Sequence, residues 1–161
     1  RTGKSRMFCA PQLENRPQGW HNQSISDWFT PISLRRFPMT DLPAIFSELK
    51  SLLQGYAPPL TPKMDTERSF DLWSQKDLVI EGRKRKEVYF AGLIIQKSYV
   101  GFYFMPVYVE TEMQAFFPPE LLRHLKGKSC FHIKTLTPEL REQIRAVLQS
   151  GFALYQQRGW V

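Results

Sequence analysis

The chain has 161 residues, of which 42% are hydrophobic and 14% aromatic, and its net charge is +7. This length and composition predict one globular domain and exclude a disordered polar chain, and no apolar run approaches the roughly 18 residues of a membrane helix. Residues 1–38 hold six Lys and Arg against two Asp and Glu, and residues 39–161 hold sixteen against thirteen, so the predicted domain is only mildly basic.

Residues 1–38 differ in character from the rest of the chain. They contain four prolines and many polar residues without a sustained period, which predicts an irregular or disordered extension. Met39 stands at the change in composition, so whether the extension is native stays open. The domain is therefore placed at residues 39–161.

An amphipathic helix is predicted over residues 40–54. Its apolar residues recur with helical spacing, Thr40 or Asp41 caps its start, and Gly55 ends it. A loop over residues 56–67 follows.

Short strands are expected at residues 70–73 and 78–81, separated from the next strand by a charged turn at 82–86. Longer β-prone runs cover residues 88–96 and 99–109, with Lys97 and Ser98 at the tip of a hairpin between them. Pro106 favours an edge or a bulge late in the second run.

The last third is predicted to contain short helical pieces over residues 110–127, a strand over 129–136 and a long helix. Thr137 caps that helix, Pro138 takes its first position, and its apolar stripe ends at Tyr155. Helices at both ends of an antiparallel meander predict an α+β two-layer sandwich with the helices on one face of the sheet.

Two stretches resemble a known family. YFAGLIIQKSYVGFYFMPVY at residues 89–108 and LKGKSCFHIKTL at 125–136, followed by a helix that ends in LYQQRGWV, resemble the bacterial YdhG-like family of domains of unknown function. That family includes frataxin-like proteins proposed as intracellular iron chaperones. The resemblance implies a frataxin-like arrangement of terminal helices on an antiparallel sheet, and iron handling as one possible activity.

The first predicted helix speaks against iron carriage on clustered carboxylates. It offers only Asp41 and Glu48, seven residues apart, so no acidic ridge forms. Loosely held iron favours oxygen-rich surfaces.

Cys130 and His132 point to the same face of a predicted strand, and His124 lies shortly before them. Thiolate and imidazole ligands suit zinc or ferrous iron, but a closed site needs about four ligands and the fourth is not obvious. A packed cysteine and a hydrogen-bonded histidine are the alternative. An enzyme built on this pair is the third hypothesis, although no feature that activates a thiol is recognised, and the chain is expected not to be an enzyme.

The leading hypothesis is a non-catalytic binding domain. A sheet covered on one face leaves alternate aromatic side chains on the other, beside the basic run of residues 83–86. The candidate ligand-binding residues are Trp73, Arg83, Lys84, Arg85, Lys86, Tyr89, Lys97, Tyr99 and Tyr103. Next to Tyr89, Tyr99 and Tyr103, the basic run could also contact phosphates while an aromatic ring stacks on a base. The alternative is a solvated loop.

The expected partner is an acidic small molecule or an acidic protein surface. A mild basic excess does not identify a nucleic-acid binder, so nucleic acid is disfavoured, and self-association stays open. Two cysteines are too few for a disulfide framework and no apolar signal-peptide core is present, which favours the cytoplasm.

Overall fold

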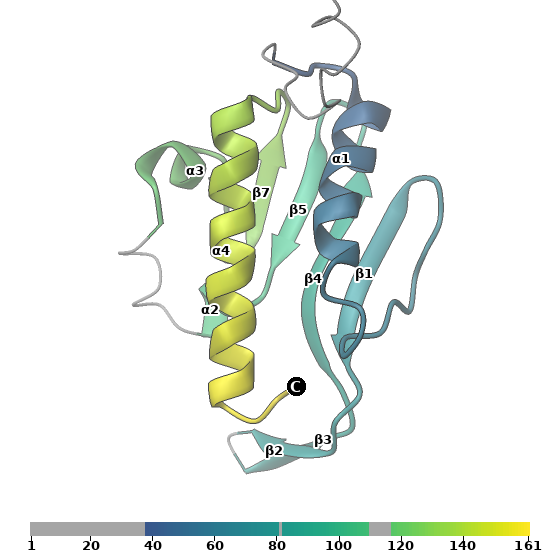
Figure 1. Ribbon diagram of the computed structural model, residues 1–161, viewed down its shortest axis with the longest axis vertical. Helices are drawn as coiled ribbons and strands as arrows, with labels where there is room; N and C mark the ends of the chain where they lie inside the picture. The colour runs from purple at the N-terminus through teal and green to yellow at the C-terminus, as the bar shows by residue number, and fades with distance from the viewer. Residues whose placement is uncertain (1–37, 81, 110–116) are drawn as a thin grey trace, which may run out of the picture. The chain divides into compact units, whose positions relative to one another are not determined.

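A five-stranded antiparallel sheet and two long helices form the domain, as the computed structural model shows for residues 38–80, 82–109 and 117–161 (Figure 1). The predicted extension, apart from Pro38, lies outside the described residues. The elements in chain order are α1 (Leu42–Gln54), β1 (Ser69–Ser74), β2 (Leu78–Ile80), β3 (Arg83–Arg85), β4 (Val88–Ile95), β5 (Val100–Phe104), α2 (Pro106–Val109), α3 (Pro119–Arg123), β6 (Leu125–Lys126), β7 (Cys130–Ile133) and α4 (Pro138–Gln157).

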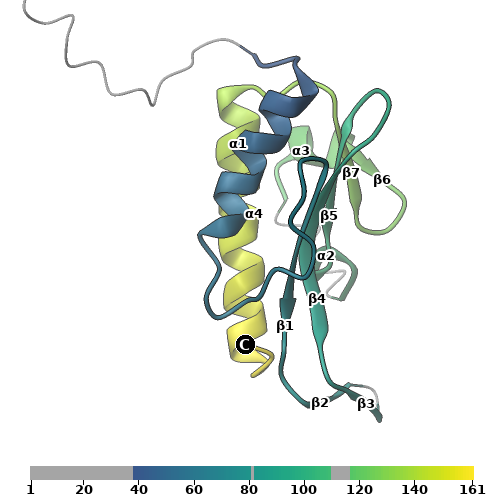
Figure 2. The same ribbon diagram turned by 90° about the vertical axis from the view of Figure 1, so that its right-hand side faces the viewer.

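Both long helices lie on the same side of the sheet, which has the strand order β1-β4-β5-β7-β6 (Figures 1 and 2). The predicted two-layer α+β sandwich is thus confirmed. The helices form where expected because their caps are in place: the Asp41 carboxylate accepts from the Ala44 N–H at 3.0 Å, and the Thr137 hydroxyl accepts from the Leu140 N–H at 3.1 Å.

The core lies between the sheet and these helices. One rung of the sheet runs through Phe70, Leu93, Phe102 and Phe131, which are paired in register across four strands and are all buried. The neighbouring helix stripes bury Leu49 and Ile144 among other side chains against it. Because side chains alternate along a strand, the residues directly before and after each member of this rung face the opposite side of the sheet.

A β-bulge changes this alternation in β4. Leu72 pairs with Ala91, but the next residue, Trp73, pairs with Tyr89, so Phe90 is the extra residue. Phe90 is fully buried on the helix side, where its ring lies 5.1 Å from that of Tyr155. The bulge lets Phe90 and Ala91 both face the core and turns Tyr89 to the opposite face.

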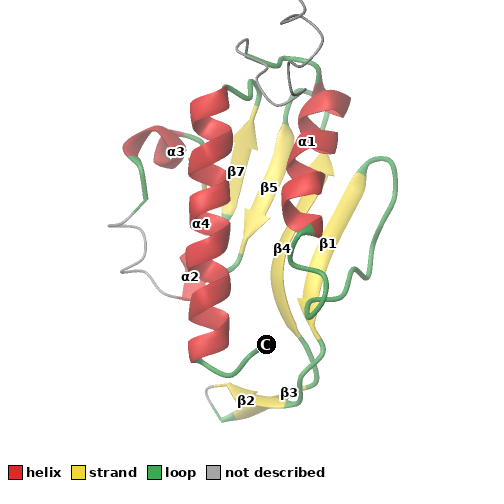
Figure 3. Cartoon of the chain, viewed as in Figure 1, coloured by secondary structure: helices red, strands yellow, loops and turns green. Residues whose placement is uncertain are grey.

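Three sequence predictions about strands need correction (Figure 3). The expected turn at 82–86 contains strand β3, which pairs with β2, because Gly82 at a φ of 75° reverses the chain one residue before it. The predicted strand 99–109 ends at Phe104, since Pro106 begins helix α2. Strand β6 lies within the region expected to be helical, where residues 110–116 are outside the described part.

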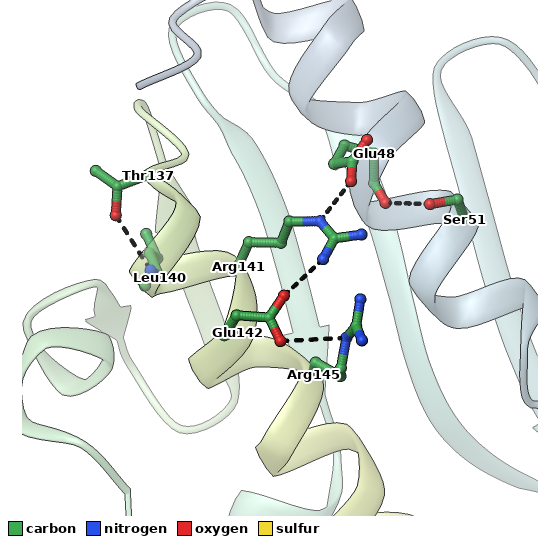
Figure 4. A network of polar contacts seen from close by, with 7 residues as sticks. All are labelled: Glu48, Ser51, Thr137, Leu140, Arg141, Glu142 and Arg145. Carbon is green, nitrogen blue, oxygen red and sulfur yellow. Dashed lines mark hydrogen bonds and ion pairs between the residues drawn. The ribbon is translucent and has the colours of Figure 1, made fainter. Parts of the chain in front are cut away.

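A polar network joins the two long helices (Figure 4). Arg141 of α4 reaches across to the Glu48 carboxylate of α1 and also contacts Glu142, which pairs in turn with Arg145. Glu48 is one of the two acidic residues that the sequence offers on the first helix. Its charge is balanced by Arg141. Among the described residues, no helix combines the length and apolar character needed to cross a bilayer.

Candidate binding face on the open side of the sheet

The face of the sheet turned away from α1 and α4, called the open face here, carries a second rung. Asp71, Gly92, Tyr103 and Cys130 are paired in register across β1, β4, β5 and β7, and Lys126 of β6 pairs with Cys130. These positions alternate with the buried core residues. The predicted candidates Trp73, Tyr89, Tyr99 and Tyr103 and the metal candidates Cys130 and His132 all lie half-buried on or beside this face. Two sites that the sequence treated separately are therefore one surface.

Tyr103 lies along the strand over Gly101. A Cβ atom at Gly101 would lie 3.1 Å from the Tyr103 ring, a tight contact that the glycine avoids. The Tyr89 side chain lies along β4 over Gly92, where a Cβ atom would collide with the Tyr89 hydroxyl. Two glycines in the middle of strands thus allow two tyrosine side chains to lie along the sheet surface.

The hydroxyl and thiol groups of this rung interact. The pKa of the Cys130 thiol is raised by burial, and a hydrogen bond with the Tyr103 hydroxyl partly offsets this rise. Burial and the neighbouring Cys130 also raise the pKa of Tyr103, while burial and the Asp71 carboxylate raise that of Tyr89. At neutral pH these three groups are uncharged, so they offer hydrogen bonds and ring surfaces rather than negative charge.

Trp73 is enclosed by its neighbours at one end of the open face. Its ring meets the Tyr89 ring edge to face with 4.9 Å between centroids, and the Lys63 ammonium lies 4.7 Å from the centre of a Trp73 ring. The indole Nε1 is buried without a hydrogen-bond acceptor among the described residues. Trp73 therefore supports Tyr89 and offers little free ring surface of its own.

Tyr99 and His132 form a stacked pair at the other end. Their ring centroids are 3.8 Å apart with an angle of 13° between the planes. His124 lies apart from this stack, where its Nδ1 is 3.1 Å from the His132 carbonyl oxygen. His132 thus takes part in an aromatic surface, a role the sequence did not suggest.

The metal candidates do not assemble into a group. Within residues 38–80, 82–109 and 117–161, no three His, Cys, Asp or Glu side chains gather closely enough to hold a metal ion. His124, Cys130 and His132, the residues proposed for iron or zinc, are all in that part of the chain. Their backbone proximity through the β6–β7 hairpin does not bring three donor atoms together.

The basic run lies on the ribbon formed by β2 and β3, which extends beyond the end of β1 and β4 (Figures 1 and 2). Arg83, Lys84, Arg85 and Lys86 are all exposed, and none forms an ion pair within the described residues. Lys86 and Glu87 connect the ribbon directly to the strand that carries Tyr89. Lys97 lies instead at the opposite end, in the hairpin beside Tyr99.

The carboxylates near the open face are already engaged. Asp71 accepts the backbone N–H groups of Lys63 and Met64 at 3.0 and 2.7 Å, and Glu87 pairs with the Lys63 ammonium. These bonds direct both carboxylates toward the segment that borders β1. No carboxylate in the described part of the chain pairs with the cations of the ribbon.

Three further residues of the face were not predicted to belong to it, namely Asp71, Gly92 and Lys126. Glycines inside β-prone runs rich in tyrosine are a signal for close approach of side chain to backbone, and that signal was available. Asp71 and Lys126 gave none, since their place depends on the register between strands.

Comparisons of the chain with protein-family models, with curated proteins and with solved structures gave no match.

Proposed function

We propose that the domain is a non-catalytic binding module that takes an acidic ligand on the open face. The observation that carries the proposal is a row of aromatic side chains near the cations of residues 83–86, which pair with no described carboxylate. The row consists of Tyr89, Tyr103, Tyr99 and His132. A half-buried row of aromatic rings next to exposed positive charge favours an acidic partner with an apolar or planar part.

The state of Cys130 supports a binding rather than a catalytic role. A thiol becomes a nucleophile as its thiolate, which requires a lowered pKa. Burial raises the pKa of Cys130 instead. We place the module in the cytoplasm and, on the resemblance of its two motifs, in the YdhG-like family. The position of the terminal helices on one face of the sheet is consistent with that placement.

Native mass spectrometry of the full chain released gently from cells tests the proposal. We expect a carried mass that is lost in Tyr103→Glu, because this change adds a negative charge to the middle of the open face. Gln149→Glu makes the same change of charge at an exposed position of α4 and should keep the mass. A chain without any carried mass, or a mass that survives Tyr103→Glu, would contradict the proposal.

A further inference from the structure

The open face carries a row of aromatic rings from neighbouring strands. The Tyr103 ring passes over the backbone at Gly101, where a Cβ atom would meet two of its ring carbons at 3.1 and 3.6 Å. The Tyr103 side chain therefore leans along its strand toward Gly101, within reach of a ligand on the open face. The neighbouring Tyr99 and His132 rings lie parallel to each other at 3.8 Å. Planar surfaces of this kind suit a ligand that is itself planar.

Positively charged side chains lie beyond the end of the aromatic row that is nearest to Tyr89. The ribbon β2–β3 extends past the sheet on the side away from α1 and α4 (Figure 2). Its residues 83–86 carry four exposed cations that no described carboxylate neutralises. Lys126 beside Cys130 adds a single charge on the same face, and Lys97 is exposed in the hairpin at the far end of the row. The arrangement is thus a line of rings with cations at both ends and at one side.

A single strand of nucleic acid matches both parts of this pattern. Its bases are planar and stack on aromatic side chains, and its phosphates pair with Lys and Arg. An acidic polypeptide supplies the negative charge but no regular series of planar rings, so it would leave the aromatic row without a matching partner. The mild net charge of the domain weighed against nucleic acid in the sequence. Once the cations and the rings share one region of the fold, their local arrangement matters more than the total.

We propose that the open face binds single-stranded nucleic acid, with bases stacked on Tyr103 and on the Tyr99–His132 pair and with phosphates held by Arg83, Lys84, Arg85 and Lys86. The inference rests on the proposed function and names the class of its ligand.

The test measures fluorescence anisotropy of a labelled twelve-nucleotide oligouridylate titrated with the full chain. If four phosphates are neutralised, the slope of log K against log salt is about −2.8, and affinity falls about 50-fold between about 50 and 200 mM salt. Arg83→Gln/Arg85→Gln should reduce the slope to about −1.4. Arg123→Gln/Arg145→Gln removes the same number of exposed arginines from the helices and should leave it unchanged.

The stacking step has its own variants. Tyr103→Leu should weaken binding about tenfold, whereas Tyr103→Phe keeps the ring and should keep the affinity. Inorganic polyphosphate, which has the charge without the bases, should bind clearly more weakly than the oligouridylate. Equal affinity for the two, or equal affinity of Tyr103→Leu and the native chain, overturns the stacking and with it the inference.

A twelve-residue polyglutamate separates this inference from the proposed function. If polyglutamate binds more tightly than the oligouridylate and Arg83→Gln/Arg85→Gln weakens it, the ligand is an acidic protein. The nucleic-acid inference then fails while the binding module stands. If no probe binds and the native chain carries no mass from cells, both fail.

Discussion

Tyr155 joins the last helix to the sheet through one hydroxyl group. Its side chain is fully buried, and the hydroxyl donates to the Tyr89 carbonyl oxygen at 2.7 Å, directly behind the ring that lies on the open face. Burial raises the pKa of Tyr155 well above its ordinary value of 10.0. Tyr155 therefore connects the backbone that carries Tyr89 to the helix that packs on the other face of the sheet.

For Tyr155→Phe we expect a loss of about 1 kcal/mol in the free energy of unfolding at pH 7, because one hydrogen bond disappears and a carbonyl loses its donor. The pH dependence has a definite sign. The unfolded tyrosine ionises near pH 10 and the folded one does not, so the native chain loses stability as the pH rises above that value. Tyr155→Phe has no hydroxyl to ionise, so its stability should fall less than that of the native chain over the same pH range.

Urea unfolding at several pH values checks both effects. Tyr89 also has a raised pKa and remains in the variant, so the decline of stability should be reduced but not abolished. Equal declines for the native chain and Tyr155→Phe between about pH 9 and 11 would contradict the assignment.

Cys130 provides a second test at the scale of a single residue. Because burial raises the pKa of its thiol, its alkylation by iodoacetamide should have a pH midpoint above that of an ordinary cysteine. Tyr103→Phe removes the hydrogen bond that lowers this pKa, so the midpoint should move further up. Both measurements use a Cys9→Ser background to leave one thiol. A midpoint below that of free cysteine would revive the hypothesis of a catalytic thiol.

At the scale of elements, α4 depends on a glycine for its distance from the sheet. Gly151 is buried, and a Cβ atom there would collide with the Phe104 ring and lie 2.8 Å from Pro106 Cγ. An alanine in a helix is normally better than glycine by about 1 kcal/mol. Here the close approach reverses that preference, because the ring of a core phenylalanine and a proline have little freedom to move.

We therefore expect Gly151→Ala to lower the free energy of unfolding by about 1–3 kcal/mol. Ser150→Ala, at the neighbouring exposed position, should change it little. Thermal unfolding followed by circular dichroism measures both variants. Stabilisation by Gly151→Ala would mean that α4 packs less closely on Phe104 than described.

The ion pair between α1 and α4 should contribute less to stability than a buried apolar side chain of the same helix. Arg141 and Glu48 retain 26% and 34% of their side-chain exposure, so water and salt weaken their attraction. We expect Arg141→Gln to cost less than about 1 kcal/mol. Leu49→Ala, one residue from Glu48 but fully buried, should cost about 2–5 kcal/mol. Chemical denaturation compares them, and a larger loss for Arg141→Gln would contradict this ranking.

At the scale of the whole molecule, metal binding distinguishes the family-based alternative. No group of three metal ligands occurs among the described residues. Glu48, the acidic residue of α1, already forms an ion pair with Arg141. We expect calorimetric titration of the full chain with Zn²⁺ or Fe²⁺ to give the same isotherm for the native chain and for Cys130→Ala/His132→Ala. Stoichiometric binding that this double variant abolishes would restore the metal hypothesis.

The sequence by itself determined the two long helices, most of the strands and the architecture. Caps at Asp41 and Thr137, prolines in the first helical turns and a regular apolar stripe are local signals, because each acts within a few residues along the chain. Alternation in residues 99–104 also placed Tyr99 and Tyr103 on the face opposite Phe102. For these features the neighbours in sequence are the neighbours in space.

Tertiary structure alone decided how the candidate surface is assembled. Strand register brought Cys130 and His132 beside Tyr103 and Tyr99, and a bulge at Phe90 turned Tyr89 onto the same face. Neither register nor a bulge is encoded by local preference, since each depends on how the facing strand and the helix above it pack. The pairing of β2 with β3 likewise turned an expected charged loop into a ribbon. Chemistry that depends on contacts between strands became visible only when the strands were placed side by side.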